Sequence, residues 1–208
     1  MPIETALVAA DEPQAVRQAR SALRNGQLVA FPTDTVYGLA ANVWDEGAVS
    51  RLYAVKGRDE LKAVPVLLAG WSSLRDIADR PSDAVRRLAA RFWPGPLTLV
   101  VRRLSIVPSV VSPGDTIGVR VPNHPFALKL LAAAGPLAVT SANRSGHPSP
   151  RSARAVLQEM AGRIELVIDG GETPGGIPST VVDCTVDPPT LIREGPISIV
   201  EVLAAMRS

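Results

Sequence analysis

Short apolar runs without polar alternation recur along the chain, and segments with helical periodicity separate them. Residues 28–31 (LVAF) and 97–101 (LTLVV) are such runs, whereas Val16, Ala19 and Leu23 recur at the spacing of one helix face. A strand that is apolar on both sides must be covered on both sides, so helices are expected on both faces of the sheet. We therefore predict one α/β domain, residues 1–208, with a twisted mixed sheet flanked by helices.

Capping and stop residues position the expected elements. Asp11 is expected to cap the first helix, which stops at residues 25–26, and Asp45 opens the second. Further helices are expected over residues 82–92, 126–134, 154–161 and 199–206. Strands are expected over residues 28–31, 64–68, 97–101, 117–121, 137–139, 166–168, 180–184 and 191–192. No repeat, charged linker or low-complexity tract marks a domain boundary.

Composition excludes several classes of protein. The single cysteine, Cys184, rules out a disulfide framework and a cysteine-rich zinc site, and its apolar neighbours indicate a buried thiol. His124 is expected to pack at a helix entry and His147 to lie in a loop. The net charge of +2 is too small to imply nucleic-acid binding. Neither a signal peptide nor an apolar run of about 20 residues is found, so a soluble cytoplasmic protein is expected.

Hydroxyl residues and cations gather in the loops after the expected strands, where open α/β sheets bind ligands. The cations are Lys56, Arg58, Lys62, Arg120 and Arg193, and the hydroxyl residues are Thr35, Ser141 and Ser179. Phosphoryl chemistry needs fixed positive charge and hydrogen-bond donors more than it needs a covalent nucleophile. The set therefore favours a polyanionic ligand.

Each of these elements also has a purely structural interpretation, and familiar motifs are absent. Thr33 and Thr35 suit turn hydrogen bonds, and Lys56 and Arg58 suit the end of a helix. The chain has no Walker phosphate loop, no dinucleotide-binding glycine motif and no serine nucleophile elbow. Only the joint pattern points to a ligand site.

That joint pattern resembles the YrdC family, and in particular the short form of the threonylcarbamoyl-AMP synthases. The resemblance runs from about residue 28 to residue 195, with five motifs in family order. The motifs are PTDTVYGL at 32–39, Lys-x-Arg at 56–58, WPGPLT at 93–98, SANRSG at 141–146 and STVVD at 179–183.

The resemblance implies that L-threonine, bicarbonate and ATP are joined into threonylcarbamoyl-adenylate with release of pyrophosphate. Partner proteins would then use this product to modify tRNA. The residues implied at the threonine are Thr35, Leu67, Arg120, Val139 and Ser179. Those implied around ATP are Lys56, Arg58, Lys62, Thr116, Ser141, Asn143, Ser149 and Arg193.

The chemistry suggests a role for each group. Arg120 is expected to bind the threonine carboxylate through two parallel hydrogen bonds. Lys56 and Arg58 are expected to act catalytically by stabilising charge on the phosphates, together with Mg²⁺. Asp34 and Asp183 suit either an indirect metal contact or a structural role. Asp59 follows Arg58 where the family usually has proline, which changes the expected shape of this loop.

Two other functions fit the same domain. One is a carbamoyl-adenylate former of the hydrogenase-maturation kind, although the acylphosphatase and zinc modules of those proteins are not found here. The other is a non-catalytic protein, such as a ribosome-assembly factor, that binds tRNA or double-stranded RNA. For backbone binding alone, however, the combination of Thr35, Arg120 and Ser179 would be unnecessary.

Overall fold

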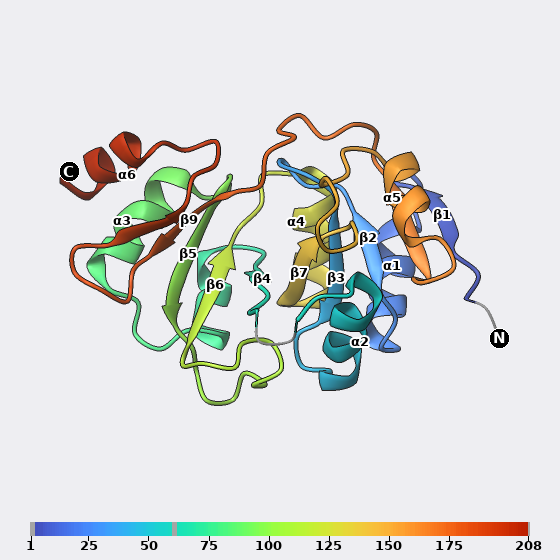
Figure 1. The fold of residues 1–208 in the computed structure, drawn as a ribbon, viewed down its shortest axis with the longest axis horizontal. Helices are drawn as coiled ribbons and strands as arrows, with labels where there is room; N and C mark the ends of the chain where they lie inside the picture. Colours follow the sequence, from blue (N-terminus) through green and yellow to red (C-terminus); the bar gives the residue numbers. More distant parts are fainter. Residues whose placement is uncertain (1–2, 60–61, 208) are drawn as a thin grey trace.

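Ten strands form one mixed sheet in the computed structural model, which describes residues 3–59 and 62–207 (Figure 1). Their order is β1-β8-β2-β3-β7-β4-β6-β5-β9-β10. Four neighbouring pairs are parallel, namely β1 with β8, β8 with β2, β4 with β6 and β5 with β9. The other neighbours are antiparallel, which confirms the predicted mixed sheet.

The elements alternate along the chain much as predicted. The strands are β1 Ala6–Ala9, β2 Val29–Phe31, β3 Gly38–Asn42, β4 Val66–Leu67, β5 Leu97–Arg102, β6 Thr116–Arg120, β7 Leu137–Ser141, β8 Leu166–Asp169, β9 Thr180–Asp183 and β10 Thr190–Arg193. The helices are α1 Ala15–Arg24, α2 Glu46–Lys56, α3 Asp83–Phe92, α4 Pro125–Ala134, α5 Ala153–Met160 and α6 Ile199–Arg207, with the 3₁₀ helix η1 at Trp71–Asp76.

Local chemistry explains where most helices begin. Asp45 and Ser82 accept hydrogen bonds from the backbone N–H groups of the residues three positions on, so they cap α2 and α3. Gly57 adopts φ 59° directly after α2, a left-handed conformation that ends the helix. The predicted cap at Asp11 is wrong. The helix begins later, after Gln14, whose side chain makes no cap bond.

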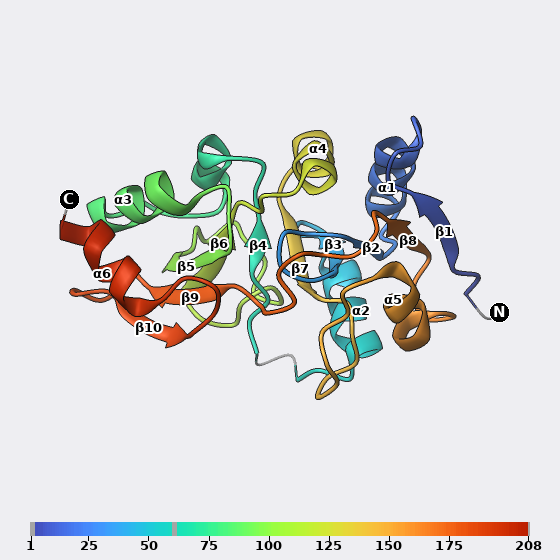
Figure 2. The same ribbon diagram turned by 90° about the horizontal axis from the view of Figure 1, so that it is seen from above.

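Helices cover both faces of one half of the sheet. Figure 2 shows α1 and α4 on one side of strands β2, β3 and β7, and α2 and α5 on the other. Phe31 and Val139 are buried in the cluster under α1 and α4, whereas Ala30 and Leu39 are buried in the cluster that includes α2 and α5. For this half, the expectation of a doubly covered sheet is confirmed.

The half formed by β5, β6 and β9 departs from that expectation. Leu99, Val119 and Val182 are fully buried in the same cluster as residues of α3 and α6. Of the alternate residues, Val100, Gly118 and Val181 are only half-buried, whereas Thr98 and Arg120 are buried. One face of this half is therefore open, and the open face leads to the pocket described below.

Strands β1 and β3 were not predicted. Residues 38–42, GLAAN, carry no β-branched side chain and no alternation, so they give no local strand signal. They form a strand because β2 and β7 flank them. Gly38, for example, lies between Phe31 of β2 and Ser141 of β7. Among the described residues, no helix has the length and apolar character needed to cross a bilayer.

Candidate functional site

A pocket of about 170 Å³ lies where the two halves of the sheet meet. Eight residues that the sequence singled out line it: Thr35, Arg58, Leu67, Arg120, Val139, Ser141, Ser179 and Arg193. The remaining lining residues are Thr33, Val36, Gly38, Pro65, Thr98, Thr140 and Pro178. The structure thus brings all five predicted threonine-site residues, and three of the eight predicted ATP-site residues, around one cavity.

Arg120 ends strand β6 and is the most constrained cation of the pocket. Its side chain is buried, and burial lowers the pKa of the guanidinium while the neighbouring Asp34 carboxylate raises it. Nε donates to the Gly95 carbonyl at 3.0 Å, Nη1 to Thr35 Oγ1 at 3.0 Å and Nη2 to Asp34 Oδ1 at 2.6 Å. A guanidinium has five N–H donors, so one N–H on each terminal nitrogen has no partner in the described part of the chain and can serve a ligand.

Asp34, which the sequence left without an assigned role, is the counter-ion of Arg120. The two side chains are 11% and 7% exposed, so this ion pair is screened little by water. The second carboxylate oxygen of Asp34 is buried and has no hydrogen-bond partner among the described residues. A buried, paired carboxylate at this position fixes the orientation of the guanidinium.

The segment that carries Asp34 and Thr35 is held from two sides. Thr33 Oγ1 donates to the Val36 carbonyl at 2.6 Å, which closes a tight turn after β2. On the other side, Gly176 N donates to the Thr35 carbonyl at 2.8 Å. A Cβ on Gly175 would lie 2.9 Å from Thr35 Cα, so only glycine allows this close approach.

Ser179 and Arg193 form the opposite wall, at strands β9 and β10. The Ser179 hydroxyl shares a hydrogen bond of 2.8 Å with Thr98 Oγ1. Arg193 Nη2 donates to the Ser179 carbonyl at 2.7 Å, and Nε donates to the same oxygen at 3.1 Å. Arg58 and Arg193 both line the pocket, and burial together with the charge of Arg58 lowers the pKa of Arg193.

Arg58 follows α2, and its side chain bonds back to the loop that comes after it. Nη2 donates to the Ala63 carbonyl at 3.1 Å, and Nε lies 3.4 Å from the Lys62 carbonyl. These carbonyls, its hydrogen-bond partners within the described residues, do not cancel its positive charge. Because no carboxylate lines the pocket in residues 3–59 and 62–207, the pocket suits an anion.

Lys56 lies behind the pocket wall. Nζ donates to the carbonyls of Ser141 and Asn143, each at 2.5 Å, and burial followed by repulsion from Arg58 lowers the pKa of this lysine to about 8. Asn143 in turn donates to the Arg144 and His147 carbonyls, and its own Oδ1 is buried without a partner in the described part of the chain. Lys56 therefore fixes the loop after β7 in this structure.

The other predicted ATP residues lie outside the pocket lining. Thr116 begins β6, four residues from Arg120, which corresponds to about 13 Å along a strand. The Lys62 carbonyl accepts a hydrogen bond from Tyr53 at 3.1 Å. Ser149 is half-buried beside Pro150, whose carbonyl accepts a bond from Tyr37 N. A ligand that reached these residues would extend well beyond the cavity.

The described residues contain no cluster of three or more His, Cys, Asp or Glu side chains that could hold a metal. Asp34 is paired with Arg120, and Asp183 Oδ1 accepts from the Thr185 hydroxyl at 2.6 Å. His124 directly precedes α4, as expected. His147 lies in a loop, also as expected, with its Nδ1 3.0 Å from the Glu159 carboxylate. These donors do not form a protein cage for Mg²⁺.

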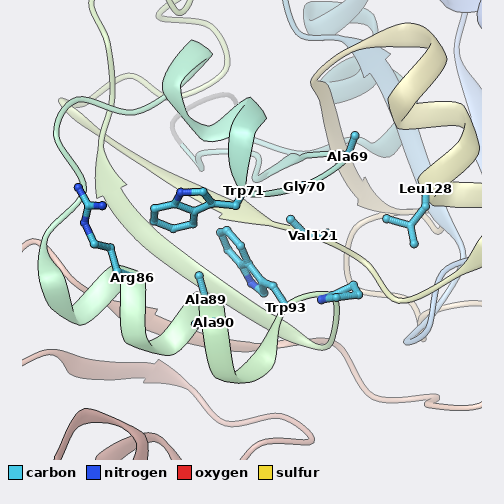
Figure 3. A pocket seen from close by; sticks show the side chains of 10 residues that line it. Ala69, Gly70, Trp71, Arg86, Ala89, Ala90, Trp93, Val121 and Leu128 are labelled. Atoms are coloured by element: carbon cyan, nitrogen blue, oxygen red, sulfur yellow. The ribbon is translucent and has the colours of Figure 1, made fainter. Parts of the chain in front are cut away.

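A larger hollow of about 500 Å³ lies just beyond the ends of β4 and β6. Figure 3 shows that Trp71 and Trp93 line it between Arg86 and Leu128 at opposite ends. Its lining is apolar except for Arg86, and it contains none of the predicted site residues. The polar chemistry therefore belongs to the smaller pocket.

Several functional neighbours were missed by sequence reasoning. Thr33 and Thr98 are both buried polar residues, and each lies inside a motif that the sequence singled out. Gly38 also lines the pocket, and a Cβ there would lie only 2.7 Å from Val139 Cγ1, so a larger residue does not fit without a shift. The motifs held the signal for Thr33 and Thr98, but only the three-dimensional structure shows that Asp34 pairs with Arg120.

Comparison with known proteins places the chain in a family. The family model Sua5_yciO_yrdC, described as "Telomere recombination", matches residues 21–195. The Pyrococcus abyssi protein named threonylcarbamoyl-AMP synthase is 47% identical over 189 residues, which is 90% of this chain and 56% of that protein. The Bacillus subtilis protein of the same name is 41% identical, over 90% of this chain and 55% of its own length. The chain thus spans about half the length of these two relatives.

A solved structure shows the same fold. The crystal structure of P. abyssi Sua5 complexed with L-threonine superimposes with a TM-score of 0.94 at 44% identity, over 97% of this chain and 61% of that chain. Together with the family match, this shows that the chain belongs to the Sua5/YciO/YrdC family.

Proposed function

We propose that this protein is a threonylcarbamoyl-AMP synthase, which condenses L-threonine, bicarbonate and ATP and releases pyrophosphate. The observation that carries the proposal is the guanidinium of Arg120, which keeps one N–H on each terminal nitrogen for a ligand. It lies in the same pocket as the apolar side chains of Leu67 and Val139. Relatives that share the domain are named for this activity, and one was solved with L-threonine.

Threonine fits the part of the pocket around Arg120. The two remaining guanidinium N–H groups suit a carboxylate, and Leu67 stands opposite Arg120 in the parallel pair of β4 and β6. An α-amino acid held by its carboxylate would therefore have an apolar wall within reach of its methyl group. Thr35 and Ser179 supply buried hydroxyls for the polar atoms of the substrate.

The phosphates of ATP fit the part of the pocket around Arg58 and Arg193. These two cations face a common space, and Ser141 adds a hydroxyl at the end of β7. Lys56 supports this wall by fixing the carbonyls of Ser141 and Asn143. Mg²⁺, which the reaction would use with ATP, is proposed to be held by the phosphates themselves and by water, as is common for Mg²⁺.

The proposed chemistry joins the two halves of the pocket. The threonine amine forms a C–N bond with bicarbonate and water leaves, which gives a carbamate. A carbamate oxygen then attacks the α-phosphorus, and the bond from that phosphorus to the pyrophosphate oxygen breaks. Among the described residues, no histidine, aspartate or glutamate lines the pocket, so positioning and fixed charge are proposed to supply most of the rate.

Pyrophosphate release from ATP tests the proposal, with threonine and bicarbonate each supplied or omitted. Release is expected only when both are present, and Arg120→Ala should abolish it. Release that needs carbamoyl phosphate instead would indicate the hydrogenase-maturation type of reaction. A folded protein that releases nothing but binds double-stranded RNA, with an affinity that Arg120→Ala weakens, would refute the synthase assignment in favour of RNA binding.

In this proposal the product passes to tRNA-modification proteins in the cytoplasm, where ATP and tRNA are found. Mixing the protein with such proteins and unmodified tRNA should therefore yield threonylcarbamoyladenosine.

A further inference from the structure

The three arginines that line the pocket differ in how their charge is balanced. Arg120 is paired with Asp34 at 2.6 Å, and both side chains are about nine-tenths buried. In the described part of the chain, Arg58 and Arg193 have only carbonyl and hydroxyl partners. The pocket thus has one neutral region and one region that carries about two positive charges.

We propose that Asp34 is a specificity-determining residue that keeps the Arg120 subsite for an amino acid and excludes phosphate from it. This inference rests on the proposed function, because it assumes that an amino acid and a polyphosphate share the pocket. Its physical basis is net charge. A zwitterion carries no net charge, whereas a phosphate group carries close to two negative charges. An ion pair without net charge gives no electrostatic attraction for that additional negative charge.

Burial makes the discrimination effective. Neither side chain of the ion pair is exposed by more than 11%, so water does not screen the Asp34 charge from a ligand at Arg120. The second oxygen of Asp34 has no donor among the described residues, so its charge is not shared with another group. Arg120 keeps two N–H groups for a carboxylate, while a dianion would be repelled by Asp34.

The reaction needs this separation. Arg58, Arg120 and Arg193 line a single cavity of about 170 Å³. Without a counter-ion at Arg120, a triphosphate could spread over all three cations and occupy the place of threonine. Asp34 therefore makes simultaneous binding of the two substrates favourable.

Calorimetric titration of pyrophosphate and L-threonine into the folded protein tests the inference without relying on turnover. In the wild-type protein, saturating pyrophosphate should change the threonine affinity by less than twofold. Asp34→Asn keeps an acceptor oxygen for Arg120 but removes the charge. This variant should bind pyrophosphate at least tenfold more tightly, and pyrophosphate should now compete with threonine.

Glu165→Gln is the matched control, because Glu165 pairs with Arg51 at 2.8 Å and neither residue lines the pocket. It should behave like the wild-type protein. If Asp34→Asn left pyrophosphate affinity and competition unchanged, the inference would be overturned. Competition in the wild-type protein would overturn it as well, and this measurement decides even if the variant does not fold.

Failure of the proposed function gives a different result. If the wild-type protein bound no threonine, the synthase assignment would fail, whereas the effect of Asp34→Asn on pyrophosphate affinity would still report on the role of Asp34.

Discussion

The buried ion pair of Asp34 and Arg120 should contribute to the stability of the protein as well as to ligand binding. Replacing Arg120 with Met removes three hydrogen bonds and leaves the Asp34 carboxylate, whose side chain is 11% exposed, without its counter-ion. Breaking a buried pair from one side costs about 3–5 kcal/mol. Asp34→Asn keeps an acceptor for Arg120, but it removes the charge from a hydrogen bond worth about 1.5–3 kcal/mol and leaves the guanidinium without its counter-ion.

The double variant should be far less damaged than the sum of these effects. With Asn at position 34 no charge is stranded when Arg120 is lost, so we expect a coupling free energy of about 2–4 kcal/mol in a double-mutant cycle. Urea unfolding followed by circular dichroism measures it, provided that the four proteins share one m-value. If the two substitutions added to within about 0.5 kcal/mol, the pair would not be the coupled buried unit described above.

Three further outcomes follow from the site. The lowered pKa of Lys56, about 8 against an unfolded 10.5, means that the unfolded chain binds more protons between these pH values. The free energy of unfolding should therefore rise by up to about 3 kcal/mol from pH 8 to pH 10.5, relative to a Lys56→Met variant, and urea titrations at several pH values measure this rise. If the difference between the two proteins did not change with pH, Lys56 would not be buried as described. Gly175→Ala places a Cβ 2.9 Å from Thr35 Cα, so the KM for threonine should rise severalfold with little change in the KM for ATP; equal changes in both would argue against a local effect. Burial raises the pKa of Cys184 to about 12, so iodoacetamide at pH 8 should label it slowly in the native protein and rapidly in urea, and rapid native labelling would show that the thiol is accessible.

Sequence periodicity predicted the elements whose signal is local. The helix that Ser82 caps and the apolar run at 97–101 were placed correctly, because caps and continuous apolar runs depend on near neighbours. The strand at residues 38–42 was missed because its small side chains carry no strand preference and two neighbouring strands impose the conformation.

The site was predictable in its membership and less so in its geometry. The family resemblance implied eight of the residues that line one pocket. It did not reveal that Lys56 turns toward the carbonyls of Ser141 and Asn143, or that Asp34 neutralises Arg120. Side-chain direction in a loop depends on contacts between residues some 85 positions apart, and a single sequence does not encode those contacts in any local pattern.

The connection from β8 to β9 has a consequence for how the protein is made. β8 lies second and β9 ninth in the sheet, and residues 170–179 run across the top of the molecule between them (Figure 1). Ser179 and Arg193 therefore join Thr35 only after synthesis has passed residue 193. A nascent chain that ends before β9 has an unpaired β5 edge and no opposite wall to its pocket. Ligands that need both walls of the pocket therefore cannot stabilise nascent chains that end before β9.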